Sequence, residues 1–379
     1  MTEGSAVTAA AAIGAKVAPR AAEIEALRTL PRDIVDALVD AGIMKLFVPR
    51  TYGGSEATVD EGIAVIEELA THDGSTAWCA MIAMTTGLLG GFLPAAHARA
   101  VYAPRDAVTG GFAAPVGRAR PVEGGLRVNG RWQWGSGTAH CTTIGGGCLV
   151  AASDDERPSA KFVLFDREDV TLLDTWYVTG LKGTGSTDYE VHDAFVPEGR
   201  WFRLAGAVPV EDGPLYRFSF FGLLALGTCA VALGLARRAV DELVDLAGTK
   251  RPQGSSRPLA ERTPVQADVA IAEASLRSAR AFVDDVVGDA WTTVARGDAM
   301  SDEQRRSVRL AATHAMVTSA AVVDRMYTQA GGAAVHDDSP FQRVLRDVHV
   351  ATQHAITSPR TFDLAGRLRL GLDTDTAQL

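Results

Sequence analysis

The sequence predicts an α+β chain of several domains, in which a helical domain, a small β-domain and a helical bundle follow one another. The chain has 379 residues, which is more than a single hydrophobic core usually serves. The spacing of its apolar residues becomes strand-like near residue 108 and helical again after residue 213. Because strands and helices form separate runs and do not alternate, they belong to separate layers or domains. We place the domains at 1–107, 108–213 and 214–379.

The first domain is predicted to be helical from residue 15 to about residue 105. The stretches IVDALVDAGIMKLFV and EGIAVIEELATHDGSTAWCAMIAM repeat apolar side chains about every 3.6 residues, which is the spacing of one helix face. Pro49 and the sequence Tyr52-Gly53-Gly54 separate the two stretches, because proline and glycine interrupt helices.

The second domain is predicted to be built from short strands. The runs RVNGRWQW, TTIGGGCLVAA, KFVLFD and DYEVHDAFVP are β-branched or aromatic, and Gly, Asp and Pro separate them. Val122-Glu123-Gly124-Gly125-Leu126 is typical of a hairpin turn.

The third domain is predicted to contain four long helices. They cover roughly 220–247, 262–297, 302–331 and 339–357, with a break at TKRPQGSSRP. The apolar segment FFGLLALGTCAVALGLA (220–236) is too hydrophobic for a free surface, so we expect it at a subunit interface.

Composition excludes several classes of protein. The formal net charge of −9 argues against nucleic-acid binding, which needs a basic surface. No uninterrupted apolar run reaches the roughly 20 residues that span a bilayer, and the N-terminus lacks an apolar signal region, so we expect a cytoplasmic protein without a membrane partner. The four cysteines contain no CxxC pair and are expected to be buried free thiols. The eight histidines contain no HExxH, and we expect no metal site. The glycine runs 145–147 and 183–185 lack the spacing of a dinucleotide-binding motif.

Five segments carry a resemblance to a known family. They are MKLFVPRTYGG (44–54), GFAAPVG (111–117), GRWQWGSGTAH (130–140), GLKGTGSTDYEVHDAFVP (180–197) and QAGGAAVHDDSPFQRVLRD (329–347). In this order they resemble the acyl-CoA dehydrogenase superfamily. The resemblance implies an N-terminal α-helical domain, a middle β-barrel or sandwich domain and a C-terminal four-helix bundle. It also implies a flavin cofactor and a homo-oligomer, most commonly a tetramer assembled through the bundle.

One departure from the family pattern separates two kinds of activity. In short-chain acyl-CoA dehydrogenases the glutamate that removes the α-proton follows the Arg-Asp arginine by about nine positions. Counted from Arg346, that position is Ala355, and no carboxylate occurs from Val348 to Arg360. Alanine cannot accept a proton, so the usual general base is absent there. A base on an earlier helix remains an alternative, although Asp241, Glu242 and Asp245 are typical of a solvated helix face.

A second pattern resembles the flavin-dependent monooxygenase branch. Aromatic residues precede Ser136-Gly137, His140 follows shortly after, and His354 lies where that branch carries a bundle histidine. The resemblance implies the oxygenase component of a two-component system, which binds reduced FAD or FMN from a separate NAD(P)H-dependent flavin reductase. Such enzymes react with O2 through a C4a-hydroperoxide and hydroxylate, or N- or S-oxygenate, an aromatic or heteroaromatic substrate such as an indole or a phenol. The alternatives are a dehydrogenase-like flavoenzyme with a displaced base and a non-catalytic flavin-binding relative.

The resemblance assigns a role to individual residues. Ser136 and His354 are the candidate catalytic residues: a hydroxyl at the flavin N5, and an imidazole that orients or deprotonates the substrate. The candidate flavin-binding residues are Phe112, Ala113, Pro115, Trp134, Ser136, Arg257, Gly331 and Gly332, with Arg257 reaching a phosphate across a subunit interface. The candidate substrate pocket is lined by Trp78, Thr86, Trp132 and His140. Several hydroxylases carry a histidine where Thr86 stands. Its absence here favours a bulky and apolar substrate. Structural alternatives stay open, among them core packing for the tryptophans, a turn hydroxyl for Ser136 and core histidines.

Overall fold

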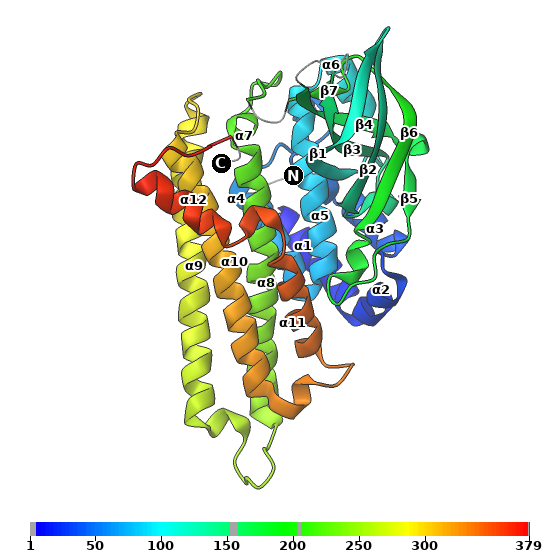
Figure 1. The fold of residues 1–379 in the computed structure, drawn as a ribbon. Helices are drawn as coiled ribbons and strands as arrows, with labels where there is room; N and C mark the ends of the chain where they lie inside the picture. The colour runs from blue at the N-terminus through cyan, green and yellow to red at the C-terminus, as the bar shows by residue number, and fades with distance from the viewer. Residues whose placement is uncertain (1–4, 152–157, 204–205, 378) are drawn as a thin grey trace.

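Helices, then a sheet, then long helices follow one another in the computed structural model, which describes residues 5–151, 158–203, 206–377 and 379 (Figure 1). The first helices are α1 (Ser5–Val17), α2 (Ala21–Leu27), α3 (Arg32–Asp40), α4 (Val59–His72), α5 (Gly74–Gly87) and α6 (Ala95–Tyr102). The strands are β1 (Thr109–Val122), β2 (Gly125–Gly135), β3 (Thr143–Val150), β4 (Ser159–Asp166), β5 (Thr171–Leu173), β6 (Thr187–Pro197) and β7 (Trp201–Phe202). The last helices are α7 (Pro214–Arg217), α8 (Phe220–Thr249), α9 (Thr263–Ala295), α10 (Asp302–Ala330), α11 (Pro340–Ala351) and α12 (Arg360–Arg369). The predicted fold class is confirmed. The domain limits stay a prediction, although the elements change type between Tyr102 and Thr109 and between Phe202 and Pro214.

The strands form one seven-stranded sheet in the order β5-β6-β2-β1-β3-β4-β7. β1 and β3 run parallel, and the other neighbours are antiparallel. Val122 pairs with Gly125 across the expected hairpin turn. The pairing of β1 with β3 shifts register at Phe112–Pro115 and again at Pro115–Gly117, so the segment expected to meet the flavin is a bulged strand.

The bundle is centred on α8, which packs against α4 and α10. Both α8 and the Gly74–Phe92 stretch are long and apolar enough to cross a membrane, but 78% and 89% of their apolar windows are buried in the fold. They are therefore core helices. The expectation for residues 220–236 was wrong, because this segment finds its apolar partners inside its own chain. Its hydrophobicity is consequently no evidence for an oligomer.

The last bundle helix is shorter than expected. α11 ends at Ala351, and His354 follows it with an extended backbone (φ −68°, ψ 124°). The His354 side chain caps the next short 3₁₀ turn, Ala355–Thr357. His354 thus lies in a loop beyond the helix on which the sequence placed it.

Candidate active site

Residues from all three parts of the chain meet around Ser136. Ser136 follows β2, is buried, and accepts a hydrogen bond from Trp78 Nε1 of α5 at 3.1 Å. The Trp78 ring lies against the His354 imidazole, with 5.7 Å between the ring centroids. The structure therefore brings together the two candidate catalytic residues and one candidate pocket residue.

A chain of hydroxyl groups continues from Ser136 into the protein. Ser136 Oγ lies 2.6 Å from Ser186 Oγ, Ser186 Oγ lies 2.7 Å from Thr184 Oγ1, and Thr184 Oγ1 donates to the Leu181 carbonyl at 2.8 Å. The indole N–H at one end can only donate, and the carbonyl at the other end can only accept. Each hydroxyl therefore donates toward Leu181. The Ser136 hydrogen is committed to Ser186, and toward the site Ser136 offers a lone pair.

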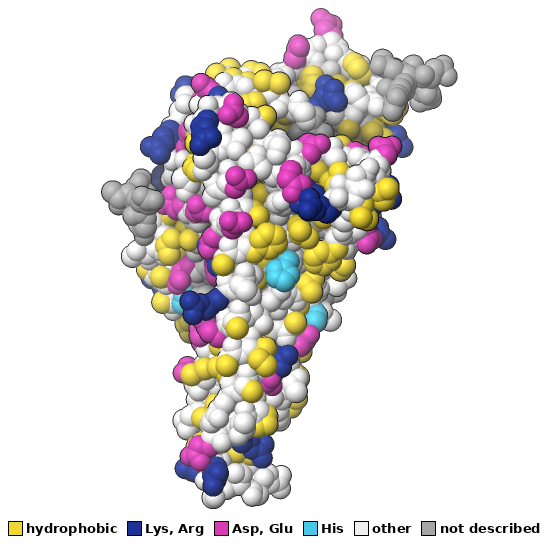
Figure 2. All heavy atoms as spheres, turned by 90° about the vertical axis from the view of Figure 1, so that its left-hand side faces the viewer, with side chains coloured by type: hydrophobic (Ala, Val, Ile, Leu, Met, Phe, Trp, Pro, Cys, Tyr) yellow, Lys and Arg dark blue, Asp and Glu magenta, His cyan; other side chains and the backbone are white. Residues whose placement is uncertain are grey.

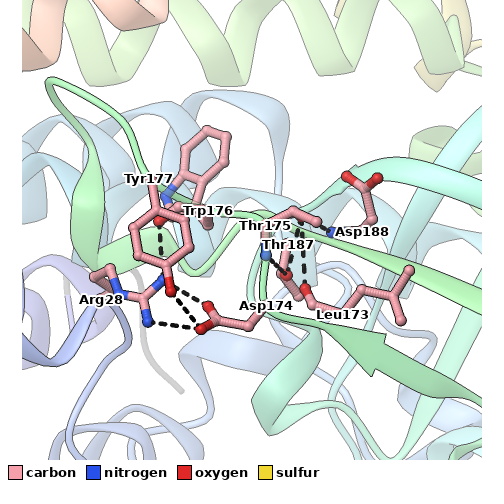
Figure 3. A network of polar contacts seen from close by, with 8 residues as sticks. All are labelled: Arg28, Leu173, Asp174, Thr175, Trp176, Tyr177, Thr187 and Asp188. Atoms are coloured by element: carbon pink, nitrogen blue, oxygen red, sulfur yellow. Dashed lines mark hydrogen bonds and ion pairs between the residues drawn. The ribbon is translucent and has the colours of Figure 1, made fainter.

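The segment that carries Thr184 and Ser186 is fastened to the N-terminal helices. Figure 3 shows Arg28, at the end of α2, paired with Asp174 at 2.6 Å and stacked over the Tyr177 ring at 4.1 Å. Asp188 N donates to Thr175 Oγ1 at 2.8 Å, which ties the segment to the start of β6. These contacts hold the hydroxyl chain in place.

Helix α11 holds the same segment from the other side. Leu181 N donates to the buried Asp347 carboxylate at 2.6 Å. A Cβ added to Gly180 would lie 2.3 Å from the Arg346 backbone, so glycine is required for this approach. Burial raises the pKa of Asp347 to about 7. The Arg-Asp pair of the sequence pattern therefore anchors the loop that carries Ser186.

The surroundings of His354 keep its imidazole neutral. Burial, followed by the nearby Arg309 charge, lowers the His354 pKa to about 4. Ile356 N donates to His354 Nδ1 at 3.3 Å. A neutral imidazole that accepts through Nδ1 carries its hydrogen on Nε2. Toward the site His354 is therefore a hydrogen-bond donor, and a role as proton acceptor would require the other tautomer.

Phe112 of β1 and Trp134 of β2 lie beyond the residues over which these two inner strands pair, 118–122 with 125–129. We call this end of the two strands the β1–β2 edge. Phe112 and Trp134 make an edge-to-face contact with 5.7 Å between ring centroids, and Trp134 is 56% exposed. Trp134 has φ +59°, an uncommon conformation for a bulky residue that is often found at ligand sites. Alternation along an ideal strand would put Trp132 and Trp134 on one face, but the pairing of β2 with β6 shifts register between Trp132 and Gly135. Trp132 instead lies in the core of the sheet, stacked on Tyr189 at 5.3 Å.

Comparison with known proteins places this arrangement in a family. The acyl-CoA dehydrogenase N-terminal domain matches residues 6–93, and the acyl-CoA dehydrogenase C-terminal domain matches residues 226–359. Indole-3-acetate monooxygenase of Pseudomonas putida is 32% identical over 359 residues, which cover 94% of this chain and 92% of that protein. The oxygenase subunit HsaA of a flavin-dependent monooxygenase from Mycobacterium tuberculosis is 30% identical over 374 residues, which cover 94% and 93%. The crystal structure of 3-HSA hydroxylase from Rhodococcus sp. RHA1 matches with a TM-score of 0.93 at 27% identity, over 99% of both chains.

The chain belongs to the flavin-dependent monooxygenase branch of the acyl-CoA dehydrogenase superfamily. The predicted family, the enzyme class and the flavin cofactor are confirmed. HsaA is named as the oxygenase subunit of its flavin-dependent monooxygenase.

Two candidate pocket residues of the monooxygenase have structural roles. Thr86 Oγ1 bonds the Thr109 hydroxyl at 2.8 Å and the Ile82 carbonyl at 2.8 Å, so it ties α5 to β1. His140 Nε2 lies 3.0 Å from the hydroxyl of Thr29, a residue of the connection between α2 and α3. Burial lowers the His140 pKa to about 4. Thr86 and His140 thus make structural contacts, and Trp132 lies in the core of the sheet. A role for these three residues in a substrate pocket stays a prediction. The sequence could not separate them from Trp78, because the contacts that distinguish the four join residues far apart in the chain.

Three of the candidate flavin-binding residues lie apart from the Ser136 cluster. Arg257 belongs to the α8–α9 connection, and Gly331 and Gly332 follow α10. Figure 1 shows both connections at the end of the bundle away from the sheet. Within one chain, these residues are not brought to the edge that carries Phe112, Ala113, Pro115 and Trp134.

A cavity of about 330 Å³ lies elsewhere, between α4, α8 and α9, lined among others by Glu67, Arg237 and Arg280. None of the candidate site residues lines it. The arginines are already paired, Arg237 with Glu273 at 2.8 Å and Arg280 with Glu67 at 2.9 Å. Among the described residues no group of three or more His, Cys, Asp or Glu side chains could hold a metal ion, and all four cysteines are free and buried.

Proposed function

We propose that this monooxygenase inserts one oxygen atom of O2 into an aromatic or heteroaromatic substrate of the indole or phenol class, the second atom leaving as water. The observation that carries the proposal is the neutral, donating His354 against the Trp78 ring, whose indole N–H in turn donates to Ser136. By the family resemblance, His354 stands next to Ala355, where a dehydrogenase holds its glutamate. The names of the relatives support an indole or phenolic substrate. We further propose a cytoplasmic location and reduced FAD or FMN supplied by an NAD(P)H-dependent reductase.

The residues on the β1–β2 edge suit a flavin. Trp134 offers exposed aromatic surface, Phe112 lies half-buried against it, and β1 shifts register beside them between Phe112 and Gly117. Bound reduced flavin would supply the electrons with which O2 is activated. It carries a hydrogen on N5, whereas oxidised flavin has a lone pair there. The lone pair of Ser136 therefore matches the reduced form, on the family resemblance that puts this hydroxyl at N5.

Among the residues that the structure describes, the acyl-CoA dehydrogenase alternative has no free base near His354. Two buried carboxylates lie in this region, and both are occupied: Asp73 accepts from Thr76 N at 2.7 Å, and Asp347 accepts from Leu181 N at 2.6 Å. Asp241 and Glu242 lie on the outer side of α8, next to Arg237 and Arg238. These contacts favour oxygenation over α-proton removal.

A reaction with labelled oxygen tests the proposed function. The purified chain is loaded with chemically reduced FAD or FMN and mixed with ¹⁸O2 and a panel of indoles and phenols. We expect one ¹⁸O atom in the product. A second sample is loaded with oxidised flavin, and we expect NADH alone to leave that flavin oxidised. Reduction of bound flavin by an acyl-CoA would establish the dehydrogenase alternative instead. Flavin binding without oxygen consumption in the presence of every substrate would establish the non-catalytic one.

We also propose a homotetramer, because Arg257, Gly331 and Gly332 could reach a flavin only from another copy of the chain. Figure 2 shows hydrophobic side chains gathered on one face of the bundle, and exposed Ile271 of α9 and Val317 of α10 are available for such an interface. Light scattering should give four times the 39.9 kDa of one chain. Arg257→Ala should weaken flavin binding without changing this mass, whereas Arg251→Ala in the same loop should not. A 39.9 kDa particle at micromolar concentration would contradict the proposal.

A further inference from the structure

Arg309 of α10 is a buried arginine connected to His354 through one residue. Its side chain is 5% exposed, and its Nη2 donates to the Ile356 carbonyl at 2.7 Å. The N–H of Ile356 donates to His354 Nδ1 at 3.3 Å. Ile356 is thus held on its carbonyl side by the guanidinium and on its N–H side by the imidazole.

We propose that Arg309 is a positioning residue for His354, which fixes the Ala355–Thr357 turn so that the imidazole presents Nε2–H to the substrate. The inference rests on the proposed function for the catalytic use of His354. It does not require Arg309 to contact substrate or flavin. The short turn follows the end of α11, so its orientation is not imposed by a continuous helix, and a fixed contact from α10 is needed to orient it.

The charge of Arg309 acts in the same direction as its hydrogen bond. Besides burial, Arg309 is the group among the described residues that shifts the His354 pKa, and it disfavours the imidazolium form. α8, which also packs on this turn, and α5, whose Trp78 lies against the His354 ring, contribute no charged group that does so in the described part of the chain. His354 consequently stays neutral from about pH 5 upward, and its donor tautomer is the one that Ile356 selects.

Three variants separate the hydrogen bond from the charge. Arg309→Met removes both, and Arg309→Gln keeps an amide donor for the Ile356 carbonyl but removes the charge. Arg306→Met is the matched control, since Arg306 lies one turn earlier on α10 and pairs with Glu303. The readout is the tautomer and titration of His354 by NMR of flavin-free protein with isotope-labelled histidine. His354→Gln identifies the signal among the eight histidines.

We expect the His354 pKa to rise in both Arg309→Met and Arg309→Gln. The Nε2–H tautomer should persist in Arg309→Gln and become mixed in Arg309→Met, while Arg306→Met should change neither property. If Arg309→Met fails to fold in a thermal melt, Arg309→Gln decides alone. A His354 signal that is unchanged in Arg309→Gln and in any folded Arg309→Met would reduce Arg309 to a structural contact and overturn the proposal.

The NMR result does not depend on oxygenation, so the two proposals can fail separately. If the wild type forms no oxygenated product but its His354 signal responds to Arg309, the positioning role stands and the proposed function falls. If the function holds, product formation falls toward low pH as His354 becomes protonated, and this fall is the acid limb of the pH profile. The neutral ring is lost as the pH falls through its pKa, so this limb should move to higher pH in Arg309→Met.

Discussion

His354→Ala should lower product formation by roughly 10²–10³-fold, the usual loss when one preorganised donor is removed from a water-excluded site. Flavin binding should remain nearly unchanged, because the ring contacts Trp78 and the Ala355–Thr357 turn and not the β1–β2 edge. Hydrogen peroxide should rise as product falls. Both are measured per O2 consumed, with reduced flavin supplied in excess.

Replacement by glutamine separates donation from proton transfer. A glutamine amide still donates a hydrogen bond but cannot accept a proton at neutral pH. Because Nδ1 is occupied by Ile356 N, we expect His354→Gln to retain much more activity than His354→Ala. His349→Ala is the control, since His349 lies on α11 but is exposed and bonded to Asp324 at 2.7 Å. If His354→Gln is as inactive as His354→Ala, the imidazole acts as a base and the donor role is wrong.

The sequence predicts the architecture well because its signals are local and repeated. Long runs with a period of 3.6 residues give α8, α9 and α10 to within a few residues, and a glycine turn gives the β1–β2 hairpin. The end of α11 is less predictable. A histidine whose side chain caps the following turn carries no helix-stop signal, so the periodicity seemed to continue to residue 357.

Individual site residues depend on backbone details that periodicity does not contain. Alternation along an ideal strand puts Trp132 and Trp134 on one face, but a register shift and the positive φ of Trp134 separate them. Thr184 and Ser186 stand in the GLKGTGS run, where the sequence indicates only small and polar residues. The two residues are two positions apart, so their side chains lie on the same side of the loop. This spacing is the signal from which the hydroxyl chain could have been predicted.

Contacts that join distant elements could not be predicted. Arg309 follows Arg305 and Arg306 on one helix, and the sequence gives no reason to single it out. Arg305 and Arg306 pair with neighbouring carboxylates on their own helix, whereas Arg309 faces a turn 47 residues later. Which of three similar arginines meets the site is decided by tertiary packing.

Ser136→Ala should lower the ratio of product to hydrogen peroxide by about 10- to 100-fold. One hydrogen bond to a polarised group contributes roughly 1.5–3 kcal/mol, and each 1.36 kcal/mol corresponds to about a factor of ten. The fold should tolerate the change, because Ser136 Oγ lies at the end of the hydroxyl chain and not in a helix or strand ladder. Thr138→Val is the matched control. Its hydroxyl is buried at the same turn and donates to the Gly135 carbonyl at 2.7 Å, outside the chain.

Ser186→Ala tests the direction of the hydroxyl chain rather than its presence. In the wild type the Ser136 hydrogen points to Ser186, so Ser136 can accept from the N5 hydrogen of reduced flavin but cannot donate to oxidised flavin. Without Ser186 the hydroxyl is free to turn and donate. We therefore expect oxidised flavin to bind more tightly to Ser186→Ala than to the wild type. The ratio of the dissociation constants of oxidised and reduced flavin should become smaller. Titration with oxidised flavin, and with reduced flavin under anaerobic conditions, measures this preference directly and needs no substrate. An unchanged ratio of the two dissociation constants would show that Ser186 does not orient Ser136.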